Sequence, residues 1–138
     1  MRFKEKRVVT CFLSYGGKVL LLKRGSMVGS YRGKWAAVSG YVEEESDKQA
    51  YREIWEETSL RGEDVELKSK GEPIAVVDQQ METKWIVHPY LFEVKDPSRI
   101  RLNWEHVEAR WVKPEEVKGF DTVPLLYETL EKVLKQRL

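Results

Sequence analysis

Arg52-Glu53-Ile54-Trp55-Glu56-Glu57 is the stretch that decides the fold of this 138-residue chain. If it is helical, its three carboxylates stand at i, i+3 and i+4, where side chains are about 5–6 Å apart at Cβ and like charges repel. Arg52 offers only one positive charge against them. A hard cation such as Mg²⁺, which takes carboxylate oxygens together with substrate phosphates, would reverse this repulsion. The alternative is an ordinary acidic helix face in solvent.

The residues before this stretch indicate where its helix begins. Gly40 follows an apolar segment at 35–38, and a glycine there lets the backbone approach a ligand closely. Ser46 is the expected N-cap, and Gln49 would complete a capping box. We expect the buried face of the helix to carry Ala50 and Ile54. The opposite, polar face would carry Gln49, Glu53, Glu56 and Glu57.

At this point the chain resembles the Nudix hydrolases. Their signature is a glycine, a spaced glutamate, Arg-Glu, an apolar residue, any residue, Glu-Glu, any residue, a glycine and an apolar residue. The residues that match are Gly40, Glu44, Arg52, Glu53, Ile54, Glu56, Glu57 and Leu60. Segments 8–35 and 103–117 are similar to the sequences that flank the signature in the family, so the resemblance covers most of the chain.

Two departures from the signature affect what the resemblance predicts. The spacing after Gly40 is shorter than usual, so either Glu44 or Glu45 takes the place of the first glutamate. Ser59 stands where the family has a glycine. The helix must therefore end in a strained left-handed cap at Ser59 or end in another way.

The resemblance and the hydrophobic pattern predict an α/β fold, a Nudix-type α/β/α sandwich with a mixed sheet, as a single domain over residues 1–138. Alternating and apolar segments predict strands at 8–14, 19–24, 73–78, 84–94 and 110–112. The strands at 73–78 and 84–94 should form a hairpin. The segment 124–138 has apolar residues on one side and is the expected C-terminal helix.

The resemblance also implies a reaction, the hydrolysis of the pyrophosphate linkage in a nucleoside diphosphate joined to another group. A nucleoside triphosphate, ADP-ribose and a nucleotide sugar all stay open as substrates. Mg²⁺ is the implied cofactor, and Mn²⁺ is also open. The implied metal ligands are Glu53, Glu56, Glu57 and the carbonyl of Gly40.

The general base stays open at this stage. Glu53 is either a further metal ligand or the base, and Glu105 is a candidate from a later loop, with Glu108 the weaker one. Arg52 would orient the carboxylates by ion pairing. The alternative function is a Nudix-fold module that binds a nucleotide without cleaving it. Retention of the carboxylates argues against this alternative, because a pure binder has no need of a self-repelling triad.

Substrate contacts are expected from basic and aromatic residues before and after the signature. The candidates are Arg24 and Lys34 for phosphates, and Trp85, Tyr90 and Trp104 for stacking on a nucleobase. Trp35 and Trp111 are assigned to the core, and His88 to a structural role. His106 adjoins Glu105 and faces either the site or solvent.

The composition excludes several other classes of protein. The net charge is +1 and both signs are interspersed, which argues against a long nucleic-acid partner and against a membrane-binding basic segment. No run is long enough to span a membrane. The lone Cys11 lies in an apolar segment, so we expect it to be buried, in a reducing, cytoplasmic setting. Many members of the family dimerise, which leaves a homodimer open.

Overall fold

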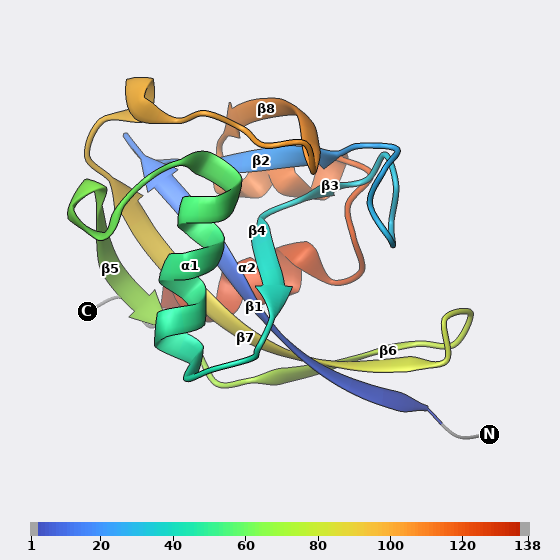
Figure 1. Cartoon of the computed structure of the whole chain (residues 1–138). Coiled ribbons are helices and arrows are strands. Elements are labelled where there is room, and N and C mark those ends of the chain that lie inside the picture. Colours follow the sequence, from blue (N-terminus) through green and yellow to red (C-terminus); the bar gives the residue numbers. More distant parts are fainter. Residues whose placement is uncertain (1–2, 136–138) are drawn as a thin grey trace.

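A mixed sheet lies at the centre of the computed structural model, which describes residues 3–135 (Figure 1). The strands are β1 (Lys4–Tyr15), β2 (Lys18–Arg24), β3 (Trp35–Ala36), β4 (Val38–Tyr41), β5 (Val65–Lys70), β6 (Ile74–Asp78), β7 (Thr83–Val94) and β8 (His106–Val112). Helix α1 (Ser46–Thr58) packs on one face and α2 (Leu126–Lys135) on the other. The predicted α/β/α fold with a mixed sheet is therefore confirmed.

Strand β1 separates two cores because its side chains alternate between the faces of the sheet. Val9, Cys11 and Leu13 point to the α1 side, where they pack with Ile54. Phe12 points to the α2 side and belongs to the core formed with that helix. Cys11 is fully buried, as predicted.

The partners of β1 change along its length, and this change opens the sheet where the site will lie. Its parallel pairing with β7 runs from Lys4 to Ser14. On its other edge the middle residues, Val8 to Cys11, pair with β4, and the last residues, Ser14 and Tyr15, pair with β2. Strand β2 then continues with β3 and β8. The sheet thus splits beside β1, between β4 and the β2–β8 pair.

The five predicted strands are present with shifted ends, but β3, β4 and β5 were not predicted. Strands β6 and β7 form the predicted antiparallel hairpin, with Asp78 opposite Thr83. Strand β8 begins at His106, earlier than predicted, and α2 begins at Leu126, later than predicted. Residues 136–138, the end of the predicted C-terminal helix, lie outside the described part of the chain. Within residues 3–135, no helix is both long enough and apolar enough to cross a membrane.

Candidate functional site

The carboxylate of Glu53 and the backbone of Gly40 lie in direct contact, which brings α1 against β4. A side-chain carbon placed on Gly40 would overlap the Glu53 carboxylate. Only glycine therefore fits at this point. The sequence predicted that Gly40 would approach a ligand closely; the close approach found here is to the side chain of Glu53, and the approach to a ligand stays a prediction.

Gln49 orients Glu53 from one turn earlier in α1. Its side-chain amide donates a hydrogen bond to Oε2 of Glu53 over 2.7 Å, and its own Oε1 accepts from the backbone N–H of Glu43 over 3.0 Å. The predicted capping box was wrong. Glu45 is the N-cap and makes no side-chain capping bond, while Ser46 is already helical and its hydroxyl is hydrogen-bonded to that of Tyr90.

Glu57 is the most enclosed carboxylate of the site, with 1% of its surface exposed, and Glu53 is 9% exposed. The predicted polar face of α1 is therefore wrong in part, because only Glu56 of the three is exposed. Strand β4 and the start of β8 cover the other two. The backbone N–H of Ser39 approaches Oε1 of Glu57 at 3.4 Å, while Oε2 has no hydrogen-bond partner within the described residues.

Burial and mutual repulsion raise the pKa values of both enclosed carboxyls. Burial is the main cause at Glu57, whose pKa lies well above its ordinary value, and the Glu105 and Glu53 carboxylates raise it further. Burial also raises the pKa of Glu53, against the hydrogen bond from Gln49. Desolvated like charges at short range favour either a shared proton or a bound cation. The two enclosed carboxyls therefore lack a compensating positive charge among the described residues.

His106 is enclosed beside Glu57, which resolves the choice left open by the sequence in favour of the site. Its Nε2 lies 3.7 Å from Oε1 of Glu57, and neither ring nitrogen has a hydrogen-bond partner in the described chain. Burial, with the positive charge of Arg24, lowers the pKa of His106 to about 4. The imidazole is therefore neutral at neutral pH and does not neutralise Glu57.

Arg52 is oriented away from the enclosed carboxylates. Its Nε lies 2.6 Å from Oε2 of Glu44, so these two residues tie the loop before α1 to the helix. Of the two candidates for the first glutamate of the signature, Glu44 is the one paired with Arg52, and Glu45 caps the helix instead.

The donor set suits a cation whose coordination is completed by other molecules. Within residues 3–135, no group of three or more His, Cys, Asp or Glu side chains is already arranged to hold a metal ion alone. Mg²⁺ is bound in proteins by one or two carboxylates, with water and substrate phosphates supplying the remaining ligands. The orphaned oxygen of Glu57 and the contact between Gly40 and Glu53 fit such a partial site.

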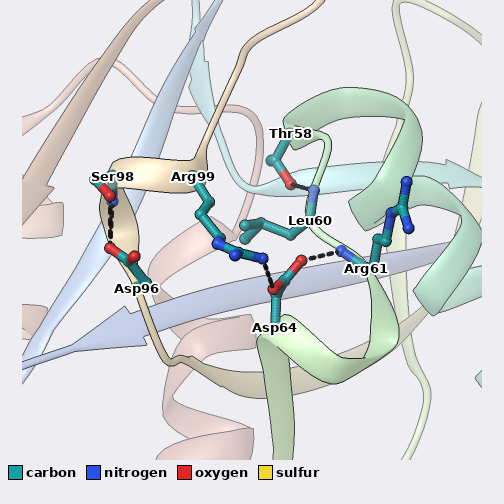
Figure 2. A network of polar contacts seen from close by, with 7 residues as sticks. All are labelled: Thr58, Leu60, Arg61, Asp64, Asp96, Ser98 and Arg99. Carbon is teal, nitrogen blue, oxygen red and sulfur yellow. Dashed lines mark hydrogen bonds and ion pairs between the residues drawn. The ribbon is translucent and has the colours of Figure 1, made fainter.

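The loop after β7 carries Glu105, and Figure 2 shows how its first part is fastened to the turn that follows α1. Asp64 accepts from the backbone N–H of Arg61 and forms an ion pair with Arg99 over 3.1 Å. Farther along, the backbone N–H of Arg101 donates to Thr58 over 2.8 Å. Glu105 thereby reaches the cavity next to α1 and adds negative charge near Glu53 and Glu57.

A cavity of about 520 Å³ opens from these carboxylates across the sheet. Glu53, Glu56 and Glu105 line it together with three predicted substrate contacts, Arg24, Trp85 and Trp104. The structure does not bring Lys34 to it, because the ammonium group of Lys34 pairs with Asp121. Tyr90 is likewise absent from the lining and donates its hydroxyl to Asp47 from a buried position.

Two lining residues, Lys6 and Tyr41, escaped the sequence reasoning. The rings of Tyr41 and Trp85 are stacked with centroids 6.2 Å apart. The Lys6 ammonium lies 5.6 Å from the Tyr41 centroid and 5.7 Å from that of Trp85. A usable signal existed, since Lys6 alternates with Val8 and Thr10 along one strand face. The positions of their partners on β4 and β7 required the sheet register.

The positions of the remaining tryptophans and of His88 can be compared with their predicted roles. Trp35 is buried and Trp111 is half-buried against the core, as predicted. His88 lies on β7 within hydrogen-bond distance of Arg7, away from the cavity. Trp104 is 67% exposed at the cavity edge, so it is free to cover a bound molecule.

The sequence of the chain matches one family model over almost its whole length. The family model described as NUDIX domain matches residues 4–135. A comparison with curated proteins found no match.

Solved structures similar to this chain share its fold at low sequence identity. The MutT protein from Methanosarcina mazei Go1 has a TM-score of 0.76 at 24% identity, covering 95% of this chain and 94% of its own. An Ap4A hydrolase from C. elegans has a TM-score of 0.72 at 18% identity, covering 94% and 93%. A bifunctional NMN adenylyltransferase/ADP ribose pyrophosphatase from Francisella tularensis has a TM-score of 0.77 at 19% identity. The match covers 98% of this chain and 42% of that longer chain.

Proposed function

Because the chain belongs to the Nudix hydrolase family, we propose that it is a metal-dependent pyrophosphohydrolase that cleaves a nucleoside diphosphate linked to another group. The observation that carries this proposal is the pair of enclosed carboxyls on α1, Glu53 and Glu57, whose pKa values are raised; Glu53 lines a cavity of about 520 Å³, and Glu57 stands one helical turn farther along. Such a pair is costly to the fold, and strongly perturbed carboxyls in a cleft are typical of functional sites.

Glu53, Glu56, Glu57 and the Gly40 carbonyl are the proposed ligands of Mg²⁺, or of Mn²⁺. A divalent ion there would neutralise charge on the phosphates and polarise the phosphorus centre. Support for this set comes from the unpartnered oxygen of Glu57 and from the close fit of Gly40 against Glu53. The exposed Glu56 stands one turn from Glu53 and faces the cavity.

The protein side chains supply positioning and a proton acceptor for attack of water on phosphorus. We assign Glu105 as the general base, because it lines the cavity while Glu53 is already engaged by Gln49. General bases must lie within hydrogen-bond reach of the proton that they remove. Arg52 acts indirectly: its ion pair with Glu44 holds the loop that follows Gly40 against α1.

The nucleoside is proposed to lie along the part of the cavity formed by β1, β4 and β7. Tyr41 and Trp85 offer an aromatic surface there, and Trp104 lies at the edge. Lys6 and Arg24 provide positive charge toward phosphates or acceptor atoms of the base. A nucleoside triphosphate, ADP-ribose and a nucleotide sugar are all compatible with this lining. A long polynucleotide is not proposed, given a net charge of +1.

The second candidate function is a nucleotide-binding module without turnover. The aromatic cavity would serve it equally well. The enclosed carboxyls favour the enzyme, because a binding module gains nothing from three acidic groups that repel the phosphates of its ligand.

The test is a coupled phosphate-release screen with Mg²⁺ against nucleoside triphosphates, nucleotide sugars, ADP-ribose and dinucleoside polyphosphates. We expect turnover of at least one class, and a fall of about two orders of magnitude or more in Glu57→Gln, because an electrostatic contribution of this kind is large. Glu128→Gln, an exposed carboxylate on α2, is the matched control and should keep full turnover.

The screen separates the two candidate functions. Binding of ATP or ADP-ribose without hydrolysis across the panel would favour the binding module. Equal turnover of wild type and of Glu57→Gln would contradict the site assignment.

Two further expectations stay predictions. The buried, unpaired Cys11 fits a reducing, cytoplasmic setting. A homodimer is proposed only from the habit of the family, and sedimentation of the purified chain would decide it.

A further inference from the structure

Asn103, the single asparagine of the chain, uses all its polar groups at the point where the site is assembled. Its backbone N–H donates to the carbonyl of Glu57 over 3.3 Å, and its carbonyl accepts from the N–H of His106 over 3.4 Å. Its side chain makes two contacts with Glu105. The N–H of Glu105 donates to Oδ1 over 3.0 Å, and Nδ2 donates to Oε1 of Glu105 over 3.2 Å.

These contacts hold both the backbone and the carboxylate of Glu105. The carbonyl of Glu105 is fixed separately, because it accepts from the N–H of Gly25 on the far side of the loop over 2.9 Å. The backbone of Glu105 is therefore held from two directions. Within residues 3–135, its side chain has one hydrogen-bond partner, Nδ2 of Asn103.

The anchoring of the preceding loop explains why Asn103 can hold Glu105 in place. The Asp64–Arg99 ion pair and the bond from Ser98 to Asp96 shape the chain after β7 (Figure 2). The bond from Arg101 to Thr58 then lays the loop along the last turn of α1. Asn103 is the next contact, and it joins the carbonyl of Glu57 to the carboxylate of Glu105.

We propose that Asn103 is a positioning residue for hydrolysis. It holds the Glu105 carboxylate in the cavity at a fixed position relative to the carboxylates of α1. The inference rests on the proposed function, in which Glu105 accepts the proton of the attacking water. An amide is suited to this task because it is uncharged and offers an acceptor to the N–H and a donor to the carboxylate at once. An aspartate keeps the acceptor and replaces the donor with an oxygen that repels Glu105.

Asn103→Asp is therefore the informative variant. With Mg²⁺ and ATP, ADP-ribose or diadenosine tetraphosphate as substrate, we expect kcat to fall by about 10- to 100-fold, since misplacement of a reacting group is costly. KM should change by less than about threefold, because Asn103 does not line the cavity. Lys95→Gln, at an exposed side chain of the same loop that makes none of these contacts, is the matched control and should keep wild-type kcat.

A double-mutant cycle with Glu105→Gln separates positioning from general damage to the loop. If Asn103 acts through Glu105, adding Asn103→Asp to Glu105→Gln should change kcat by less than about threefold, because the group that it positions is already gone. The same loss of kcat in both backgrounds, or wild-type kcat in Asn103→Asp alone, would overturn the inference.

A second readout needs no turnover. Selective ¹⁵N-asparagine labelling gives one backbone and one side-chain amide signal, both from Asn103. We expect the side-chain signal to shift on Glu105→Gln and to stay in place on Glu128→Gln. An unmoved signal would overturn the contact itself. A wild-type protein with this shift but without hydrolysis of any substrate would instead overturn the proposed function, and with it the catalytic role given to Asn103.

Discussion

The enclosed carboxyl of Glu57 is the single residue that most affects how the metal-free protein responds to pH. Its folded-state pKa is raised well above the ordinary 4.5, mainly by burial. The folded protein therefore holds a proton that the unfolded chain has released. Its contribution to the free energy of unfolding is present below about pH 4.5 and is lost as pH rises through the folded pKa.

His106 acts in the opposite direction, but in a lower range of pH. Its pKa falls from 6.5 to about 4 on folding, so its contribution to stability is full above about pH 6.5 and is lost as pH falls through about 4. Above about pH 6.5 the effect of Glu57 can be observed without that of His106.

The resulting prediction concerns thermal unfolding in EDTA from about pH 4.5 up to about pH 8.5, with wild type compared to Glu57→Gln so that the change at His106 cancels. We expect the midpoint of wild type to fall across this range relative to that of Glu57→Gln, because glutamine cannot ionise. Added Mg²⁺ should raise the midpoint of wild type more than that of the variant at the upper pH. Parallel pH profiles of the two proteins would show that Glu57 is ionised in the folded state without metal.

At the scale of elements, the end of α1 has a strained residue that the sequence had marked. Ser59 is the C-cap with φ of 68°, and its N–H donates to the carbonyl of Trp55 over 2.9 Å. Of the two alternatives that the sequence left open, the left-handed cap is the one found. A side chain in this region is strained, and glycine is not.

Ser59→Gly is therefore expected to stabilise the protein by up to about 1 kcal/mol, measured by urea unfolding. In the described part of the chain, the change removes one side-chain hydrogen bond, the weak contact of the Ser59 hydroxyl with the carbonyl of Arg101 at 3.4 Å. Ser59→Ala keeps the strain and loses the same contact, so it serves as the control. A less stable Ser59→Gly would mean that the contact with Arg101 outweighs the strain.

The loop from 95 to 105 is the second element-scale feature that matters for the site. It has little regular structure beyond the 3₁₀ turn at Pro97–Arg99, yet polar contacts with Asp64 and Thr58 fasten it to the end of α1 (Figure 2). A helix and a loop separated by almost 40 residues thus form one unit. Changes that break these contacts are expected to act on turnover through the placement of Glu105.

At the scale of the whole molecule, the cavity is made by strands that are distant in sequence. Lys6 on β1 stands beside Trp85 on β7 in the parallel pairing, and Tyr41 on β4 is paired with Val8. Within the described chain, Lys6 forms no ion pair, so its charge is available to a ligand. The α1 carboxylates lie toward the other end of the same cavity.

Lys6→Met should therefore weaken substrate binding more than it slows the reaction. We expect KM for the nucleotide hydrolysed in the screen to rise by about 3- to 10-fold, the effect of roughly 1 kcal/mol, with kcat nearly unchanged. Lys4→Met, on the same strand but outside the cavity lining, is the control. An unchanged KM in Lys6→Met would place the nucleoside elsewhere.

The sequence by itself determined the fold class and the identity of the acidic helix. Hydrophobic alternation predicted the β6–β7 hairpin, and the i, i+3, i+4 spacing placed three carboxylates on one helix, because both patterns follow from local backbone geometry. The tertiary structure alone decided which carboxylates are enclosed. Glu57 is buried and Glu56 is exposed because β4 and the start of β8 cover one side of α1. It alone also joined Asn103 to Glu57, since contacts across almost 50 residues depend on how the loop packs and leave no periodic signal in the chain.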